Sequence, residues 1–150
     1  MKIIKFISII IMSLFYIGVG LAHFIMPEKF LIIIPNSFPF PLFLVYVSGF
    51  FEILLGILLL VKKFRFFAGI GLVALLIAVF PANIFLYVDE FARQEYGGIS
   101  QNQALVRMFF QIPLIVIAYW HSKEFLSKWF NYVCVIISIP TILYFFWILF

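Results

Sequence analysis

The chain has 150 residues, of which 67% are hydrophobic, 21% are aromatic and only 11% are charged. Ordinary soluble domains contain about 45–50% apolar and about 25% charged residues, so this chain cannot cover itself with polar surface and the composition predicts a lipid bilayer around it. The net charge of +4 does not indicate nucleic acid, because the basic residues lie near the ends of apolar runs. The single cysteine, Cys134, excludes an internal disulfide and a dithiol relay.

Five apolar runs follow one another along the chain, with lengths typical of membrane-spanning helices. In chain order they cover residues 3–25, 42–61, 66–88, 104–120 and 130–150, and the fourth is shorter and less purely apolar. The sequence therefore predicts an all-α membrane protein with one transmembrane domain at 1–150. We expect a four-helix transmembrane bundle at 3–121 and a fifth C-terminal transmembrane helix at 130–150.

The distribution of basic residues predicts how the helices cross the membrane. If the runs alternate, one side carries Lys2, Lys5, Lys62, Lys63, Arg65, Lys123 and Lys128, and the other carries Lys29, Arg93 and Arg107. The first run is too long for the apolar part of a typical signal peptide, so we interpret it as a retained helix. The richer side is expected to be cytoplasmic, which places the N-terminus in the cytoplasm.

The connections between the runs differ in character. Residues 26–41 are apolar but contain four prolines, which forbid a continuous helix and predict a lid over an outward-facing cavity. Residues 89–103 are polar and predict a flexible loop or a frayed helical extension. On the cytoplasmic side we expect His121, Trp120 and Trp129 to lie at the membrane interface.

Six of the polar side chains within the apolar runs lie toward one side of the membrane, as their depths counted at 1.5 Å per residue show. Glu52 is the most informative, because it is the only charge in its run and acids at bilayer depth are costly and rare. Antiparallel packing of four helices should gather all six in the outer half of the membrane. The predicted ligand-binding residues are His23, Ser48, Glu52, Asn83, Arg107 and Gln111.

A charged Glu52 needs a cation or several hydrogen-bond donors, and Arg107 is the cation at comparable depth. This pairing leaves two interpretations open. The pair is either a structural contact that fixes the helix register, or part of a site that binds a ligand or handles protons. One histidine and one glutamate fall short of the ligands that zinc needs, so no metal site is predicted.

These residues, in this order, resemble the DoxX family of small bacterial membrane proteins. The resemblance runs from about Tyr16 to Trp120, and the usual Leu-Pro-x-Gln pattern is replaced here by Phe109-Phe110-Gln111. It rests on Gly20-x-x-His23-Phe24 with Pro27, Pro35, Ser48-Gly49-x-x-Glu52, Phe80-Pro81-Ala82-Asn83, and Arg107 with Gln111.

The resemblance implies a protein of the bacterial inner membrane. Relatives are linked to quinone-coupled oxidation of sulfur compounds and to membrane oxidoreductase complexes, and more distant ones act as assembly factors. We therefore expect a small, partly apolar ligand, such as a quinone or a lipid-like molecule, and a membrane or redox partner protein. The alternative is a non-enzymatic scaffold or assembly chaperone whose polar cluster is structural. The residues leave open whether the chain is an enzyme.

Overall fold

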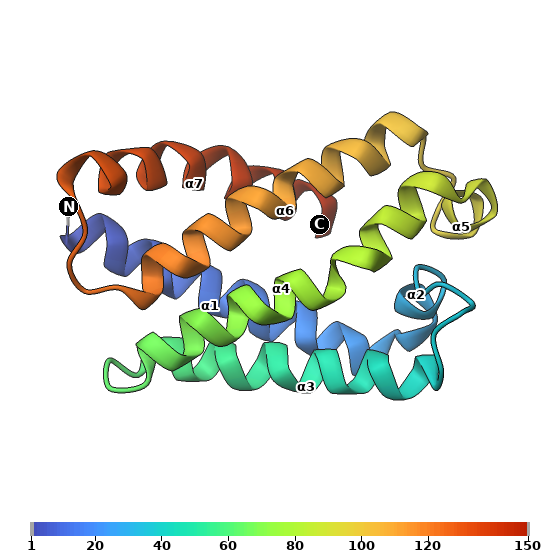
Figure 1. Ribbon diagram of the computed structural model, residues 1–150, viewed down its shortest axis with the longest axis horizontal. Coiled ribbons are helices and arrows are strands. Elements are labelled where there is room, and N and C mark those ends of the chain that lie inside the picture. Colours follow the sequence, from blue (N-terminus) through green and yellow to red (C-terminus); the bar gives the residue numbers. More distant parts are fainter. Residues whose placement is uncertain (1, 150) are drawn as a thin grey trace.

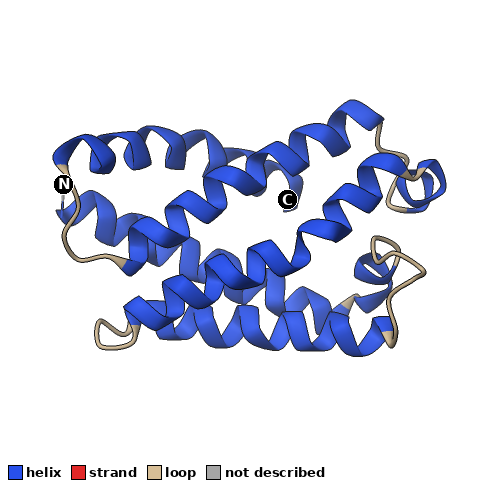
Figure 2. Ribbon diagram, in the orientation of Figure 1, coloured by secondary structure: helices blue, strands red, loops and turns tan. Residues whose placement is uncertain are grey.

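The structure is a computed structural model that describes the backbone of residues 2–149 and the side chains of residues 2–145. Every regular element in this part of the chain is a helix (Figure 2). In chain order the helices are α1 (Lys2–Ile25), α2 (Pro27–Leu31), α3 (Pro41–Leu60), α4 (Arg65–Val88), α5 (Glu90–Glu95), α6 (Gln101–Ser122) and α7 (Lys128–Leu149). Five of them are long and apolar enough to cross a membrane, which confirms the predicted all-α membrane protein.

The long helices form two closely packed pairs, α1 with α3 and α4 with α6. Helix α3 also packs against α4, and α7 packs against α6 and contacts α1. Figure 1 shows the N-terminus, the α3–α4 turn and the α6–α7 link at one end, called the proximal end below. The short helices α2 and α5 lie at the opposite, distal end (Figure 1). The predicted fifth helix therefore covers the bundle formed by its own chain.

Glycines bring α1 and α3 into close contact. A Cβ on Gly20 would lie 2.7 Å from the carbonyl oxygen of Gly49, and a Cβ on Gly49 would lie 2.5 Å from the Cβ of His23. Neither distance is compatible with a real side chain, so this approach requires glycine at both positions. Small residues are the usual means by which helix backbones come together in a membrane. The same contact sets His23 directly against the backbone of α3.

The proline-rich segment at the distal end folds as predicted, without a continuous helix. Pro27 begins the single short helix α2, and Pro41 begins α3; both occupy positions where the missing N–H costs no helical hydrogen bond. Between them the chain turns back, with Phe40 in the left-handed region at a φ of 52°. The side chain of Ile33 is buried, which fixes the segment to the bundle.

Three contacts close the proximal end. The indole N–H of Trp120 donates to Asn131 Oδ1 over 2.7 Å, Ser8 Oγ lies 3.0 Å from His121 Nε2, and Lys5 donates to the carbonyl of Lys123. Trp120 and His121 lie in the last turn of α6 but are buried, with exposed fractions of 0% and 1%, whereas Trp129 is 77% exposed. The reason is that α1 and α7 cover the end of α6.

Helix α7 contributes to the core that it covers. Its Cys134 is fully buried, in keeping with a small apolar side chain. The ring of Phe145 lies 5.3 Å from that of Phe15, and Tyr144 stacks on Phe110 at 4.1 Å between ring centroids. These contacts attach α7 to both helix pairs.

Candidate functional site

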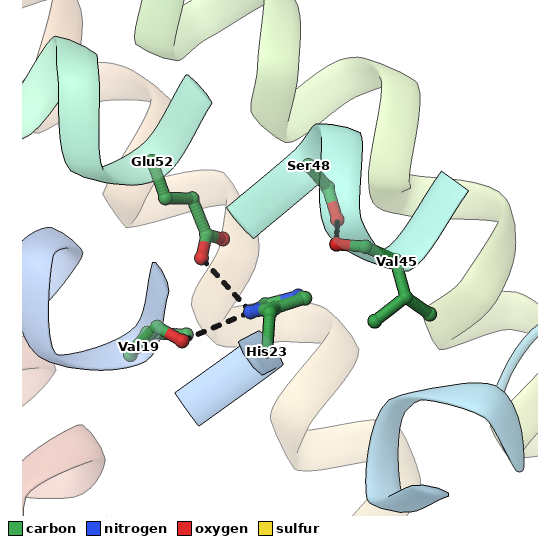
Figure 3. A network of polar contacts seen from close by, with 5 residues as sticks. All are labelled: Val19, His23, Val45, Ser48 and Glu52. Atoms are coloured by element: carbon green, nitrogen blue, oxygen red, sulfur yellow. Dashed lines mark hydrogen bonds and ion pairs between the residues drawn. The ribbon is translucent and has the colours of Figure 1, made fainter. Parts of the chain in front are cut away.

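An acid and an imidazole meet at the interface between α1 and α3. The Nδ1 atom of His23 lies 3.2 Å from Oε2 of Glu52, and only 8% and 13% of the two side chains are exposed (Figure 3). His23 comes from the distal half of α1, and Glu52 from the middle of α3. The contact with Gly49 holds the imidazole at the level of the carboxylate. Sequence reasoning predicted both residues as site residues, and the structure brings them together.

The contacts of His23 show which ring nitrogen carries the proton and which is left for another partner. Nδ1 lies 2.9 Å from the carbonyl oxygen of Val19, an acceptor, so Nδ1 carries a proton and donates it there. Oε2 of Glu52 is buried and has no hydrogen-bond partner among the described residues. In Figure 3 the ring lies between Glu52 and the turn of α3 that carries Val45 and Ser48. Since both described contacts involve Nδ1, Nε2 is the nitrogen that remains for a further partner.

An apolar cavity of about 230 Å³ lies beside this ring, called the His23 cavity below. Its polar lining comes from His23 and Ser48, and Ser48 Oγ donates to the carbonyl of Val45 over 2.9 Å. Phe30 of α2 stacks on the imidazole with 3.6 Å between ring centroids. The remaining walls are Ile33, Ile34, Pro35 and Phe38 after α2, Leu44, Val45 and Val47 on α3, and Leu75, Ala78, Val79, Pro81 and Ala82 on α4. The proline-rich segment thus covers a cavity, as the sequence predicted.

Further polar atoms without partners lie on the same face of α1. The hydroxyl oxygens of Ser13 and Tyr16 are buried and have no hydrogen-bond partner in the part of the chain that the structure describes. Gly56 of α3 packs against the backbone of Ser13. Buried polar groups of this kind normally bind ordered water. Helix α1 therefore carries two buried hydroxyl groups that no described protein atom satisfies.

The other three predicted site residues form a separate network between α4 and α6. Arg107 donates from Nε to Asn83 Oδ1 over 3.1 Å and from Nη1 to the hydroxyl of Tyr96 over 2.6 Å. Asn83 Nδ2 donates to Gln111 Oε1, and Gln111 Nε2 donates to the carbonyl of Leu76 over 2.6 Å. That carbonyl belongs to α4, five residues before Pro81. These hydrogen bonds tie α4 to α6 and to Tyr96 within the chain, and they leave Nη2 of Arg107 without a partner among the described residues.

The predicted pair of Glu52 and Arg107 is not formed. Among residues 2–145 the structure has two ion pairs, His23 with Glu52 and the exposed Lys62 with Glu124. The physical reason is the pairing of the helices: Glu52 faces α1, whereas Arg107 faces α4. The six predicted residues therefore form two clusters of three rather than one site.

Two aromatic residues of these clusters escaped the sequence analysis. Phe30 and Tyr96 lie in the connections, in α2 and after α5, so counting depths along the apolar runs could not find them. The one sequence signal for these two residues was an aromatic side chain in a connection that follows or precedes a helix with a predicted site residue. Within the described side chains, no group of three or more His, Cys, Asp or Glu could hold a metal ion.

Comparison with known proteins gives one relationship. No curated protein and no solved structure matches this chain. The resemblance to the DoxX family stays a prediction. Residues 12–122, which include both polar clusters and the first four long helices apart from the start of α1, match a family described as a domain of unknown function (DUF8561). Because this match covers well over half of the chain, the protein belongs to the DUF8561 family.

Proposed function

We propose that this membrane protein binds the ring of a quinone, or of a similar small and partly apolar molecule, in the His23 cavity. The observation that carries the proposal is the buried imidazole, which faces an apolar cavity on one side and the Glu52 carboxylate on the other. Pockets for small molecules are mostly apolar and contain a few placed polar groups. His23 and Ser48 are such groups here.

The size of the cavity limits the ligand. Pockets for drug-sized molecules hold about 300–1,000 Å³, whereas the His23 cavity holds about 230 Å³. A single substituted ring fits this volume, and a long isoprenoid tail does not. The tail of a membrane quinone would therefore extend into lipid, past the apolar side chains of α3 and α4.

The chemistry of His23 suits a quinol hydroxyl. Nε2 accepts the hydrogen bond of the hydroxyl while Nδ1 donates to Val19. If the hydroxyl proton moves to Nε2, the imidazolium has the Glu52 carboxylate 3.2 Å from Nδ1 to balance its charge. In this function His23 receives the proton, Glu52 stabilises the charge and Ser48 contacts the ring.

The surroundings of the site complete the proposal. The excess of Lys and Arg at the proximal end favours a cytoplasmic N-terminus and a distal end outside the cell. The resemblance to the DoxX family favours the bacterial inner membrane and a membrane redox protein that exchanges electrons with the bound quinone. The His23 cavity would then open toward the outer half of the membrane.

A second candidate is a non-enzymatic scaffold or assembly chaperone. The observation that favours it is the hydrogen-bonded network of Asn83, Arg107 and Gln111, which ties α4 to α6 within the chain. Half of the predicted site therefore has a structural explanation. Under this candidate the His23 cavity stays empty of quinone.

The two histidines allow a matched test, because both are buried but only His23 lines the cavity. A photoreactive azidoquinone should label wild-type protein in lipid nanodiscs, with the labelled peptides in α2 to α4. His23→Gln should reduce the labelling tenfold or more, and His121→Gln should leave it unchanged. Thermal unfolding in detergent checks that both variants fold. Absence of labelling in the wild type, or equal loss in both folded variants, would favour the scaffold.

A further inference from the structure

A second and larger cavity of about 730 Å³ lies at the distal end, between α2, the α5–α6 connection and Tyr144 of α7. It shares no lining residue with the His23 cavity, and we call it the Arg107 cavity. Its polar lining residues include Lys29, Glu95, Tyr96, Asn102, Gln103 and Arg107. Two cations and one acid give this lining an excess of positive charge.

The guanidinium group of Arg107 is held in a fixed orientation. Nε is bound to Asn83 and Nη1 to the hydroxyl of Tyr96, and the guanidinium carbon lies 5.0 Å from the centroid of the Tyr96 ring. Nη2 makes no hydrogen bond to any described residue. Because the Tyr96 oxygen accepts from Arg107, its own proton is free to donate. The network thus presents one guanidinium N–H edge and one hydroxyl at the cavity wall.

Lys29 adds a second positive charge from the α2 side of the cavity. Neither Lys29 nor Arg107 forms an ion pair with a described carboxylate, although Glu95 also lines the cavity. The amides of Asn102 and Gln103 supply further polar groups at the start of α6. Donors therefore line the cavity both from α2 and from α6.

We propose that the Arg107 cavity binds a phosphate group, that of an anionic lipid. Arg107, Lys29 and Tyr96 would donate to the phosphate oxygens, and a planar guanidinium group is well suited to them. The cavity is far larger than a bare anion, and its apolar lining of Ile32, Ile99 and Val106 provides a surface for the rest of the lipid. Arg107 lies six residues into α6, about 9 Å from its start, a depth close to the headgroup region.

Lys29 and Glu95 line the Arg107 cavity with opposite charges, so their substitution should have opposite effects on anion binding. Lys29→Gln should weaken the binding of dioctanoyl phosphatidylglycerol about three- to fivefold, because an exposed cation is lost. Glu95→Gln should strengthen binding by a similar factor, because a negative charge beside the anion is removed. Arg93→Gln is the matched control: Arg93 lies on α5 at the same end, donates to the carbonyl of Tyr87, and is absent from the cavity lining. It should bind like the wild type.

Binding is measured by native mass spectrometry and by thermal stabilisation in detergent, with dioctanoyl phosphatidylcholine and inorganic phosphate as further probes. Preference for phosphatidylglycerol with the expected order of variants supports a lipid headgroup. If inorganic phosphate fully displaces phosphatidylglycerol, the cavity binds phosphate, but its ligand is a free anion rather than a lipid headgroup. Equal weakening by Lys29→Gln and Arg93→Gln, or no preference over phosphatidylcholine, overturns the proposal. Azidoquinone labelling of the His23 cavity is a separate readout, because the two cavities share no lining residue.

Discussion

At the scale of single residues, the Glu52 carboxylate is the group that most needs an explanation. It is buried next to His23, yet its Oε2 atom has no hydrogen-bond partner among the described residues. A purely structural pair would normally satisfy its buried oxygens, because an unsatisfied one costs about 1–3 kcal/mol. The proposed function accounts for this oxygen, because a protonated His23 would place a positive charge beside it.

Glu52→Gln separates these roles. The side chain keeps its shape, so the free energy of unfolding should change by less than about 1.5 kcal/mol. Azidoquinone labelling should fall, because no carboxylate remains to balance a charged imidazole. The double variant with His23→Gln should lose no more labelling than His23→Gln alone, since the two residues act as one unit. A large loss of stability in Glu52→Gln, with labelling intact in the folded fraction, would show a structural pair.

The sequence predicted the depth of these residues but not their direction. Counting along each run placed Glu52 and Arg107 at comparable depth, so both were expected in one pocket. Height does not determine which neighbour a side chain faces, and that depends on which helices pair. Glycine contacts turn Glu52 toward α1, and the hydrogen bond to Asn83 turns Arg107 toward α4.

At the scale of elements, hydropathy predicted both ends of α1, α3 and α4 and the start of α7 to within two residues. The predicted end of the fifth run, residue 150, lies outside the described residues. The exception is α6, which begins at Gln101, three residues before its apolar run. Its start is set by a capping box in which Ser100 accepts from the Gln103 N–H and the Gln103 side chain accepts from the Ser100 N–H. Polar capping residues carry no hydropathy signal, so the run alone could not locate this end.

The seam between α1 and α3 offers a test at this scale. Gly49→Ala places a methyl group against His23 and the Gly20 carbonyl, so the helices must separate. We expect a loss of about 1–3 kcal/mol in the free energy of unfolding, as for other overpacked sites, and reduced azidoquinone labelling. Gly18→Ala is the control, because a Cβ there meets no atom within 4 Å. It should be neutral or stabilising, since alanine favours a helix. Equal effects of the two substitutions would contradict this seam.

At the scale of the whole molecule, composition predicted the fold class and left the arrangement open. Lipid and protein interior are both apolar, so hydropathy cannot distinguish a core side chain from one facing lipid. Leu72 is fully buried and Ile77 on the same helix is 57% exposed, although both are strongly hydrophobic. The pairing of α1 with α3 and α4 with α6 emerges only from small residues and polar contacts between helices.

The orientation of the molecule can be tested with single cysteines. Gln94→Cys lies on α5 at the distal end, and Lys63→Cys lies in the α3–α4 turn at the proximal end; both native side chains are exposed. A membrane-impermeant maleimide should label Gln94→Cys in intact bacterial cells and Lys63→Cys only after lysis. The wild type should stay unlabelled, because Cys134 is buried. The reverse pattern would show that the N-terminus lies outside.

Adjacent residues of the short helix α2, and of the turn that follows it, line different cavities. Lys29 and Ile32 line the Arg107 cavity, whereas Phe30 and Ile33 line the His23 cavity. Helix α2, which is only about one and a half turns long, thus separates the Arg107 cavity from the His23 cavity. A ligand that shifted α2 on binding in one cavity would change the shape of the other cavity. Each ligand would then change the binding affinity of the other by the same factor. If both proposals hold, the lipid composition of the membrane would change how much quinone is bound in the His23 cavity.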